Sequence, residues 1–274
     1  MLNQKPDLIS PAFPSPLMQG KRGLVMGVAN NRSIAWGIAE MLRSHGAGLA
    51  FTYQGEGLGK RVIPLAQSVG SDLVFDCDVN DDGSVKAVFD ALEKKWGTFD
   101  FIVHAIAYSN KNELKGKYMN TSRENFLMTM NTSCYSFTAV AKYAEPFMNV
   151  GGSLLTLSFS GAERVMPNYN VMGVAKAALE ASVRYLAADF GSKDIRVNAI
   201  SAGPMRTLAG SAIGGARDIL RYSQDAAPLK RELQLHDIGG AALYLLSDLS
   251  ASVTGEIHHV DSGFSTIGMP HSRD

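Results

Sequence analysis

The fold of this chain is decided by the stretch Gly23-Leu24-Val25-Met26-Gly27-Val28-Ala29-Asn30-Asn31-Arg32-Ser33-Ile34-Ala35. A short apolar run ends at Gly27, a polar loop follows, and Ser33 precedes the first residues of an amphipathic segment. This order predicts a buried strand, a loop and a helix that begins at Ile34. The free N–H groups and the dipole of such a helix favour a pyrophosphate. We expect Gly27 to allow close approach of backbone and ligand, and Gly37 to pack the helix closely against the strand.

The same alternation of apolar runs and amphipathic segments continues along the chain. The apolar runs span 23–28, 48–53, 73–77, 101–107, 153–158, 196–201 and 256–260. The amphipathic segments between them span 34–45, 57–69, 82–96, 121–148, 172–190 and 236–247. Strands that are covered on both faces have nearly continuous apolar sequences. The pattern therefore predicts one α/β domain of Rossmann type, a doubly wound, seven-stranded parallel sheet with helices on both faces.

Two segments fall outside the alternation. Prolines disfavour regular structure, and residues 1–20 contain Pro6, Pro11, Pro14 and Pro16. We therefore expect a flexible N-terminal tail over 1–20 and a single domain over 21–274. The segment near 205–224 carries Gly210, Gly214 and Gly215. We interpret it either as a mobile substrate-binding segment or as a poorly packed surface excursion.

Charge balance and cysteine usage exclude several classes of protein. Lys plus Arg and Asp plus Glu number 26 each, so no overall field attracts nucleic acid or an anionic membrane. Cys77 and Cys134 are the only cysteines and belong to no metal-ligand cluster. The sequence has no signal-peptide pattern and no apolar stretch of the roughly 20 residues that a membrane helix needs. We expect a cytoplasmic protein without a metal, nucleic-acid or membrane partner.

The ends of the second and third apolar runs carry candidate dinucleotide contacts. Gln54 follows the second run, where dinucleotide folds meet the adenosine ribose. Its neutral side chain suits a 2′-hydroxyl, and the next basic residues, Lys60 and Arg61, come several positions later. This favours NADH over NADPH, unless Gln54 is a solvated loop residue. Asp78, beside Val79, is expected either to accept a hydrogen bond from adenine or to cap the next helix.

The fourth apolar run ends in His104-Ala105-Ile106-Ala107-Tyr108. The small alanines let the backbone run close to a bound ligand. We therefore take Ala105 and Ile106 as candidate cofactor contacts and Ala107 and Tyr108 as candidate substrate contacts. His104 is interpreted as a packed strand residue rather than a catalyst or ligand.

The helix after the fifth run carries the candidate catalytic residues. Tyr169 stands seven residues before Lys176, and Met172, which has no proton to give, stands four before it. Seven helical residues span about 10 Å at ~1.5 Å per residue and almost two turns, so both side chains face one side. We expect Lys176 to hold a nicotinamide ribose and Tyr169 to reach a substrate carbonyl. The alternative is a buried aromatic residue and a solvated lysine.

Together these residues resemble the bacterial NADH-dependent enoyl-acyl-carrier-protein reductases, a divergent branch of the short-chain dehydrogenase/reductase superfamily. The similarity runs from about Gly20 to Gly268. Its most selective element is the spacing of Tyr169 and Lys176. Further elements are Ser33-Ile34-Ala35 after Gly27, Phe51-Thr52-Tyr53-Gln54, Arg196-Val197-Asn198-Ala199-Ile200-Ser201-Ala202-Gly203-Pro204 with Thr207, and His259-Val260-Asp261-Ser262-Gly263-Phe264.

The resemblance implies reduction of the C2=C3 double bond of trans-2-enoyl thioesters on acyl carrier protein, in fatty acid biosynthesis. NADH would deliver hydride to C3, and Tyr169 would hydrogen-bond the thioester oxygen as charge develops there. Thr207 would contact the cofactor, or alternatively cap a helix. The implied cofactor contacts are Gly27, Ser33, Ile34, Gln54, Asp78, Val79, Ala105, Ile106, Lys176 and Thr207. The implied substrate contacts are Ala107, Tyr108, Phe159, Tyr169, Met172 and Met205.

Three features depart from the family's pattern. Phe159 stands where members usually have a second tyrosine, so it keeps the aromatic volume without the hydroxyl. Ala107 stands where glycine is commoner and narrows the space beside the nicotinamide. The carrier-docking helix, typically basic, has only two basic residues here. We expect docking of an acidic carrier to be weaker or to use basic residues nearby; the candidates are Arg217, Arg221, Lys230 and Arg231.

Two other functions stay open. A short-chain carbonyl reductase would place a phenol four residues before the lysine, where this chain has Met172. A specialised or catalytically weak paralogue, acting on other enoyl thioesters or as a cofactor-binding regulator, would account for Phe159 and the weakly basic helix. Members of the family are generally tetramers, so we expect a homotetramer in which apolar residues of 121–148 and 172–190 pack between subunits.

Overall fold

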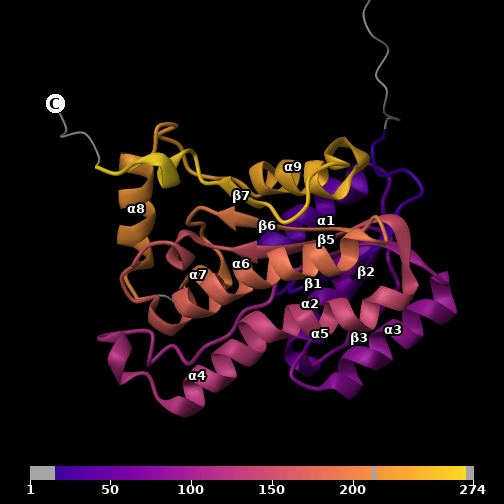
Figure 1. Cartoon of the computed structure of the whole chain (residues 1–274), viewed down its shortest axis with the longest axis horizontal. Coiled ribbons are helices and arrows are strands. Elements are labelled where there is room, and N and C mark those ends of the chain that lie inside the picture. The colour runs from indigo at the N-terminus through magenta and orange to yellow at the C-terminus, as the bar shows by residue number, and fades with distance from the viewer. Residues whose placement is uncertain (1–15, 212–213, 270–274) are drawn as a thin grey trace, which may run out of the picture.

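Seven parallel strands form one sheet in the order β3-β2-β1-β4-β5-β6-β7 (Figure 1). The computed structural model describes residues 16–211 and 214–269. The strands are β1 (Arg22–Met26), β2 (Gly48–Tyr53), β3 (Val74–Asp76), β4 (Phe99–His104), β5 (Met148–Ser158), β6 (Arg196–Ala202) and β7 (Ile257–Val260). The predicted doubly wound, seven-stranded sheet is confirmed. Because the strand order reverses between β1 and β4, ligands are expected beyond the C-terminal ends of these two strands.

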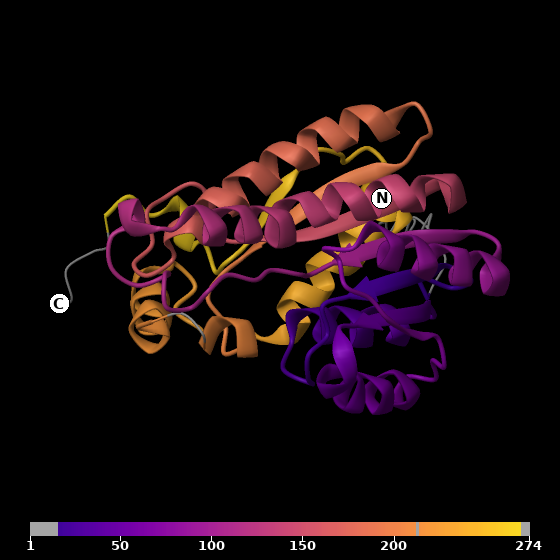
Figure 2. The same cartoon turned by 90° about the horizontal axis from the view of Figure 1, so that it is seen from below.

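Helices cover both faces of the sheet, as predicted (Figures 1 and 2). One face packs against α1 (Ile34–Ser44), α2 (Gly55–Ser68) and α9 (Leu235–Leu246). The other packs against α3 (Asp82–Trp96), α4 (Arg123–Met130), α5 (Ser136–Ala144) and α6 (Asn170–Gly191). Side chains of β4 alternate between the two cores, with Val103 beneath α1 and Ile102 on the opposite face.

Short helices complete the described chain. They are α7 (Leu208–Ser211), α8 (Ala216–Ala226) and the 3₁₀ turns η1 (Tyr118–Asn120), η4 (Ser160–Ala162), η5 (Asp248–Ser250) and η6 (Phe264–Thr266). Among the helices of residues 16–211 and 214–269, none combines the length and the apolar character that a membrane crossing requires.

The helix predicted over 121–148 is in fact four shorter pieces. A π-helical turn, η2 (Asn131–Tyr135), joins α4 to α5, and a 3₁₀ turn, η3 (Glu145–Phe147), ends the segment. Strand β5 then begins at Met148 instead of residue 153, with a register shift against β4. Gly151 has a positive φ of 77°, so the chain bends within this first part of the strand. The prediction for this region was wrong in both the helix length and the strand start.

Strands β1 and β4 are shorter than predicted, because the chain leaves the sheet at Met26 and at His104 rather than at residues 28 and 107. The predicted tail over 1–20 also needs correction. Residues 1–15 lie outside the described residues, but residues 16–20 form a turn in which the side chain of Met18 is fully buried. The backbone N–H of Met18 donates to the carbonyl of His45 at 2.9 Å. The domain therefore begins several residues earlier than predicted.

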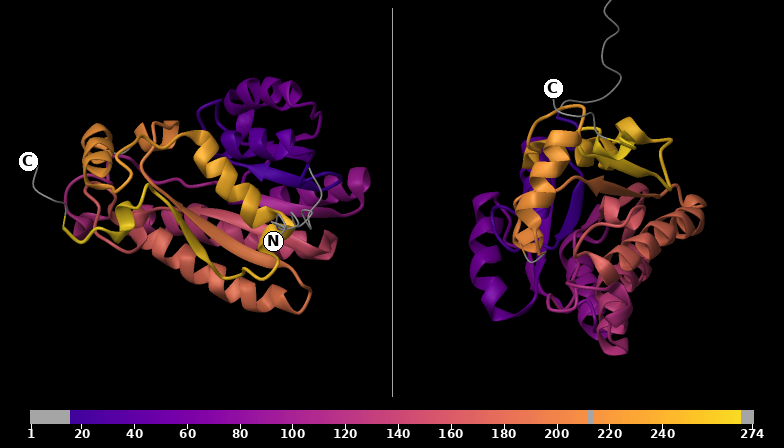
Figure 3. Two further views of the ribbon diagram at one scale, coloured as in Figure 1. Left: turned by 90° about the horizontal axis from the view of Figure 1, so that it is seen from above. Right: turned by 90° about the vertical axis from the view of Figure 1, so that its left-hand side faces the viewer.

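Helices α1 and α9 pack side by side on one face of the sheet (Figure 3). A Cβ on Gly37 would lie 2.6 Å from Cβ of Leu235, and a Cβ on Gly239 would lie 3.0 Å from the Gly37 carbonyl. These contacts leave no room for a larger residue. Gly37 therefore permits close packing of helix on helix, and the prediction that it packs against a strand was wrong.

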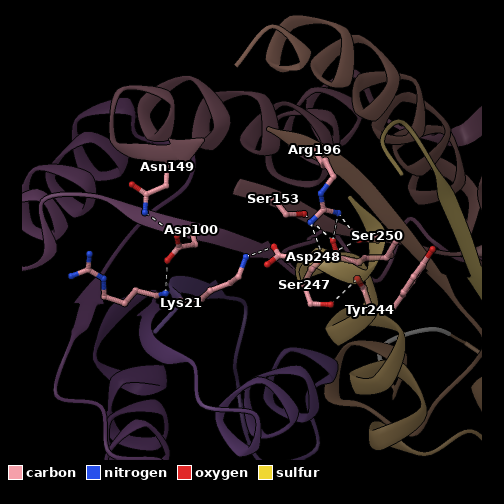
Figure 4. A network of polar contacts seen from close by, with 11 residues as sticks. Lys21, Asp100, Asn149, Ser153, Arg196, Tyr244, Ser247, Asp248 and Ser250 are labelled. Carbon is pink, nitrogen blue, oxygen red and sulfur yellow. Dashed lines mark hydrogen bonds and ion pairs between the residues drawn. The ribbon is translucent and has the colours of Figure 1, made fainter. Parts of the chain in front are cut away.

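A buried arginine ties the end of α9 to the sheet (Figure 4). Arg196, at the start of β6, donates to the carbonyls of Leu245 and Ser247 at 2.6 and 3.1 Å and to the Ser250 hydroxyl at 2.6 Å. Ser153 of β5 donates to the same Leu245 carbonyl at 3.0 Å. The guanidinium thus satisfies carbonyls at the C-terminal end of the helix, where a positive charge is favourable.

Arg196→Met should lower the free energy of unfolding by about 2–4 kcal/mol, because it leaves these buried acceptors without a charged donor. Urea denaturation of both variants measures the loss. Arg61→Met is the matched control, because Arg61 is exposed on α2. Equal stability of the Arg196 variant and the control would contradict the structural role of this network.

Candidate active site

The candidate residues gather at the C-terminal ends of β1, β4 and β5, at the end of the molecule where α8 lies (Figures 1 and 3). Gly27 follows β1 with a φ of 98°, and a Cβ there would lie 2.1 Å from the carbonyl oxygen of Ala105. Only glycine fits such a position. Its first role is therefore to let β1 and the loop after β4 approach each other.

The loop between β1 and α1 presents free N–H groups. The Ser33 hydroxyl accepts from the N–H groups of Ala29 and Asn30 at 3.0 and 3.1 Å, which holds the loop in shape. Within the described residues, the N–H groups of Ile34 and Ala35 have no hydrogen-bond partner. Free donors at the start of an 11-residue helix suit an anion. Ser33 and Ile34 are thus placed where a pyrophosphate fits.

An acidic residue that the sequence reading missed lies beside Gln54. Gln54 is exposed at the end of β2, and the N–H of the next residue, Gly55, donates to the carboxylate of Asp76 at 2.9 Å. On α2, Lys60 is paired with Glu56 at 2.8 Å. A carboxylate here, with the nearest lysine neutralised, favours a ribose hydroxyl over a 2′-phosphate. The presence of Asp76 near the end of the third apolar run was the signal in the sequence that could have identified this carboxylate.

Asp78 does not cap α3, so that alternative for it was wrong. Its carboxylate accepts from the backbone N–H and the side-chain amide of Asn80, at 2.9 and 3.0 Å. Asp81 is the cap, because its carboxylate accepts from the N–H of Gly83. Val79 is buried next to this turn. Asp78 still lies at the sheet edge where an adenine contact was predicted.

The loop after β4 runs along the opening of the site. Ala105 and Ile106 are half-buried, whereas Ala107 and Tyr108 are exposed. His104 is fully buried, and its two ring nitrogens contact the hydroxyls of Thr156 and Ser136 at 3.0 and 2.9 Å. Burial, with a smaller contribution from Lys176, lowers the pKa of His104 to about 3. His104 is therefore a neutral packed residue, as predicted.

Tyr169 is the residue just before α6 and lies between two asparagines in the left-handed region. Asn168 and Asn170 have φ values of 57° and 37°. Their side-chain amides donate to the carbonyls of Gly214 and Gly116, at 2.8 and 3.2 Å. Backbone strain of this kind persists only where the surroundings impose it, and it is concentrated at functional sites. The two bonds thus fix the backbone on either side of Tyr169.

The ring of Tyr169 is enclosed by apolar side chains. It meets Phe159 edge-on with ring centroids 5.0 Å apart, and it packs in a small cluster with Leu114 and Met172. Tyr169 is 7% exposed. Burial, and then Glu180, raise the pKa of its phenol. Tyr169 therefore keeps its proton, and its hydroxyl, which has no partner within the described residues, is free to donate a hydrogen bond.

Lys176 is buried too, so the alternative of a solvated lysine was wrong. The residue is 6% exposed, and its Nζ donates to the carbonyl of Leu157 near the end of β5 at 2.7 Å. Burial lowers the pKa of Lys176 to about 8, while Cys134 and Glu180 act in the opposite direction. A buried ammonium with one carbonyl partner has donors left for the hydroxyls of a ligand.

The structure separates two predicted residues from this cluster. Met205 packs against the apolar core beneath α1 and α9 rather than against Tyr169. Thr207 caps α7, because its hydroxyl accepts from the N–H of Gly210 at 2.9 Å. The helix-cap alternative for Thr207 is thus what the structure shows, and a cofactor contact remains a prediction.

The predicted mobile segment near 205–224 includes α7 and most of α8. Residues 212–213 of this segment lie outside the described residues.

A second buried charge on α6 was missed by the sequence reading. Glu180 follows Lys176 by four residues, one helical turn, and its carboxylate accepts a short hydrogen bond from the Ser158 hydroxyl. The spacing of four residues from Lys176 along the helix was the signal in the sequence that could have identified Glu180.

Among the described residues, no group of three or more His, Cys, Asp or Glu side chains could hold a metal ion.

Comparison with known proteins is consistent with this geometry. Residues 27–265 match the family model described as enoyl-(acyl carrier protein) reductase. The enoyl-acyl-carrier-protein reductase (NADH) 2 of Rhizobium meliloti (strain 1021) is 64% identical over 254 residues, which cover 93% of this chain and 95% of that protein.

Solved structures give the same result. FabI from Candidatus Liberibacter asiaticus has a TM-score of 0.91 and 55% identity, covering 93% of this chain and 99% of that one. The enoyl-acyl-carrier-protein reductase of Anaplasma phagocytophilum, in complex with NAD, has a TM-score of 0.89 and 54% identity over 94% of this chain and 96% of that one. With its fold, its Tyr169–Lys176 pair and a match over most of its length, this chain belongs to the enoyl-acyl-carrier-protein reductase family.

Proposed function

We propose that this protein reduces the C2=C3 double bond of trans-2-enoyl thioesters carried by acyl carrier protein, with NADH, as a step of fatty acid biosynthesis. The observation that carries the proposal is the pairing of a buried, protonated phenol with a buried amine at the end of β5. Lys176 supplies the amine from α6, and Tyr169, the residue just before α6, supplies the phenol. The names of the relatives support the same reaction.

The residues at the strand ends fit NADH. The free N–H groups at the start of α1 suit the pyrophosphate. Gln54 at the end of β2 and Asp76 at the end of β3 suit a free ribose hydroxyl. Lys176 would hold the nicotinamide ribose. The bound cofactor supplies the hydride that adds to C3 of the substrate.

Tyr169 acts on the thioester carbonyl. Its phenol donates a hydrogen bond to the oxygen on which negative charge gathers during the reaction, so the bond is stronger in the transition state than in the ground state. The apolar side chains around the ring of Tyr169 lower the local dielectric constant, which strengthens this hydrogen bond. Phe159 has no hydroxyl to share the task, so its edge-on contact serves to orient the ring of Tyr169.

The two rival functions are supported less well. A carbonyl reductase needs its phenol four residues before Lys176, and the buried Met172 occupies that position. A cofactor-binding regulator without turnover would need no protonated donor held in place by strained backbone on both sides, as Tyr169 is.

Carrier docking involves a surface that was not predicted. Of the predicted basic residues, Arg221 is paired with Asp218 at 3.5 Å and Arg231 with Asp237 at 3.3 Å. The loop before α4 and the first residue of that helix add exposed basic side chains that form no ion pair within the described residues: Lys111, Lys115, Lys117 and Arg123. Lys115 lies beside Gly214, next to α8. We propose that this loop and the exposed Arg217 together receive an acidic carrier.

We also propose a homotetramer that acts in the cytoplasm. The assembly is supported by exposed apolar side chains on the helices that we expect to pack between subunits: Leu127, Tyr135, Val174 and Tyr185.

Light scattering of the purified protein should give a mass four times that of the chain. The Tyr185→Glu substitution should reduce the measured mass, because it places a charge on an apolar contact surface. A monomer at micromolar concentration would contradict the assembly.

Tyr169→Phe should lower kcat by about 10²–10³-fold, because it removes the one donor to the developing oxyanion. NADH affinity, followed by fluorescence, should stay unchanged. Tyr244→Phe, on the distant α9, is the control and should keep full activity. Undiminished turnover of enoyl thioesters by the Tyr169 variant would refute the proposed role of the phenol.

Reversing the charge of Lys115 and Lys117 together should raise KM for the carrier-bound enoyl substrate about tenfold, because exposed charges of this kind contribute roughly 0.5–1 kcal/mol each. The neutral N-acetylcysteamine thioester should react as before. Lys94→Glu with Lys95→Glu, exposed on α3, is the control pair. Docking at this loop is excluded if both pairs behave alike on the carrier-bound substrate.

A further inference from the structure

Two buried side chains of opposite charge hold neighbouring residues at the end of β5. Lys176 donates to the carbonyl of Leu157 at 2.7 Å, and Glu180 accepts from the hydroxyl of Ser158. The two charged residues are one turn apart on α6, so their side chains lie on the same face of the helix. Glu180 is 7% exposed. A carboxylate at such a depth is costly unless a nearby charge or donor compensates it.

Glu180 is the carboxyl that acts on both Lys176 and Tyr169, and its own pKa is raised by burial. Cys134 also faces Lys176, but burial raises the pKa of its thiol, which is therefore neutral at neutral pH. His104, on β4, is neutral as well, because burial lowers its pKa to about 3. The Ser158 hydroxyl donates to Glu180, which favours the ionised form of the carboxyl against the effect of burial.

Three further charged or titratable groups act on Glu180: Glu163, His259 and Arg184. Glu163, from the turn after β5, contacts Nε2 of His259 on β7 at 3.1 Å. Burial has the largest effect on the pKa of Glu180 and raises it; Glu163 raises it further, whereas His259 and Arg184 lower it. Arg184 is one further turn along α6 and exposed. None of these groups contacts Lys176 or Tyr169, so the charge that acts on the inner site is that of Glu180.

We propose that Glu180 is a positioning residue, whose carboxylate, held by Ser158, keeps Lys176 protonated for the cofactor and adds to the preference of Tyr169 for its protonated form. This inference rests on the roles proposed above for Lys176 and Tyr169. A negative charge stabilises a nearby ammonium and disfavours a phenolate, so one carboxylate serves both residues. The direction agrees with the effects of Glu180 on the pKa values of Lys176 and Tyr169.

The test is the titration of Lys176 in the protein without cofactor. The ¹³Cε signals of labelled lysines give its pKa, and the signal that disappears in Lys176→Arg identifies it. Glu180→Gln, which preserves the shape and an acceptor for Ser158, should lower this pKa by roughly one unit. The pH above which NADH binding weakens should fall by the same amount. Glu180→Ala removes the carboxylate without introducing a buried amide, and it should lower the pKa of Lys176 by the same amount.

Two matched variants separate the charge from the packing. Glu180→Asp keeps the charge and should leave Lys176 close to its original pKa. Ser158→Ala removes the hydrogen bond but not the carboxylate, and should shift Lys176 less than Glu180→Gln does. A purely structural Glu180 would change the melting temperature without moving either titration, and unchanged titration of Lys176 in Glu180→Gln would overturn the proposal.

The proposed function fails by a different result. If Tyr169→Phe keeps full turnover, or Lys176→Arg keeps full NADH affinity at every pH, the roles of those residues are wrong. The titration of Lys176 in the cofactor-free protein still reports whether Glu180 controls its charge.

Discussion

The close approach of α6 to the end of β5 is the constraint on which the site depends. A Cβ on Gly173 would lie 2.6 Å from the Gly161 carbonyl, and a Cβ on Gly161 would lie 2.3 Å from the ring of Tyr169. Glycine at both positions lets the helix start directly against the turn after the strand. This contact brings Lys176 within reach of the Leu157 carbonyl. The same contact places Tyr169 against the turn that follows β5.

The two ends of the sheet show opposite uses of polar groups. At the N-terminal end of β6, Arg196 has its buried bonds satisfied by carbonyls and a hydroxyl, and the network holds helix to sheet (Figure 4). At the other end, Lys176 has spare donors, and the phenol of Tyr169 has no partner in the described chain. Satisfied polar groups stabilise the fold, and unsatisfied ones are available to a ligand. The free energy stored near Tyr169 is offset by packing elsewhere.

The positions at which this chain departs from the residues that the resemblance implies lie on the proposed substrate side of the site. Phe159 packs edge-on against Tyr169, so in the proposed mechanism a single phenol stabilises the developing charge. The basic groups near the opening come from the loop before α4 as well as from α8. Neither feature changes the arrangement of Lys176 on α6, so in the proposed function they affect the binding of substrate and carrier.

The sequence by itself determined the alternation of strands and helices, the turn at Gly27 and the Tyr169–Lys176 spacing, because these follow from local periodicity and from residue types that few positions tolerate. Only the tertiary structure decided that Gly37 meets a helix, that the segment 121–148 is broken by a π turn, and that Thr207 caps α7. The charge environment of Lys176 also lay beyond the sequence, because burial and the position of Glu180 depend on residues brought together from β5, α6 and η2. Local pattern specifies elements, whereas pKa and enclosure are properties of the packed assembly of elements.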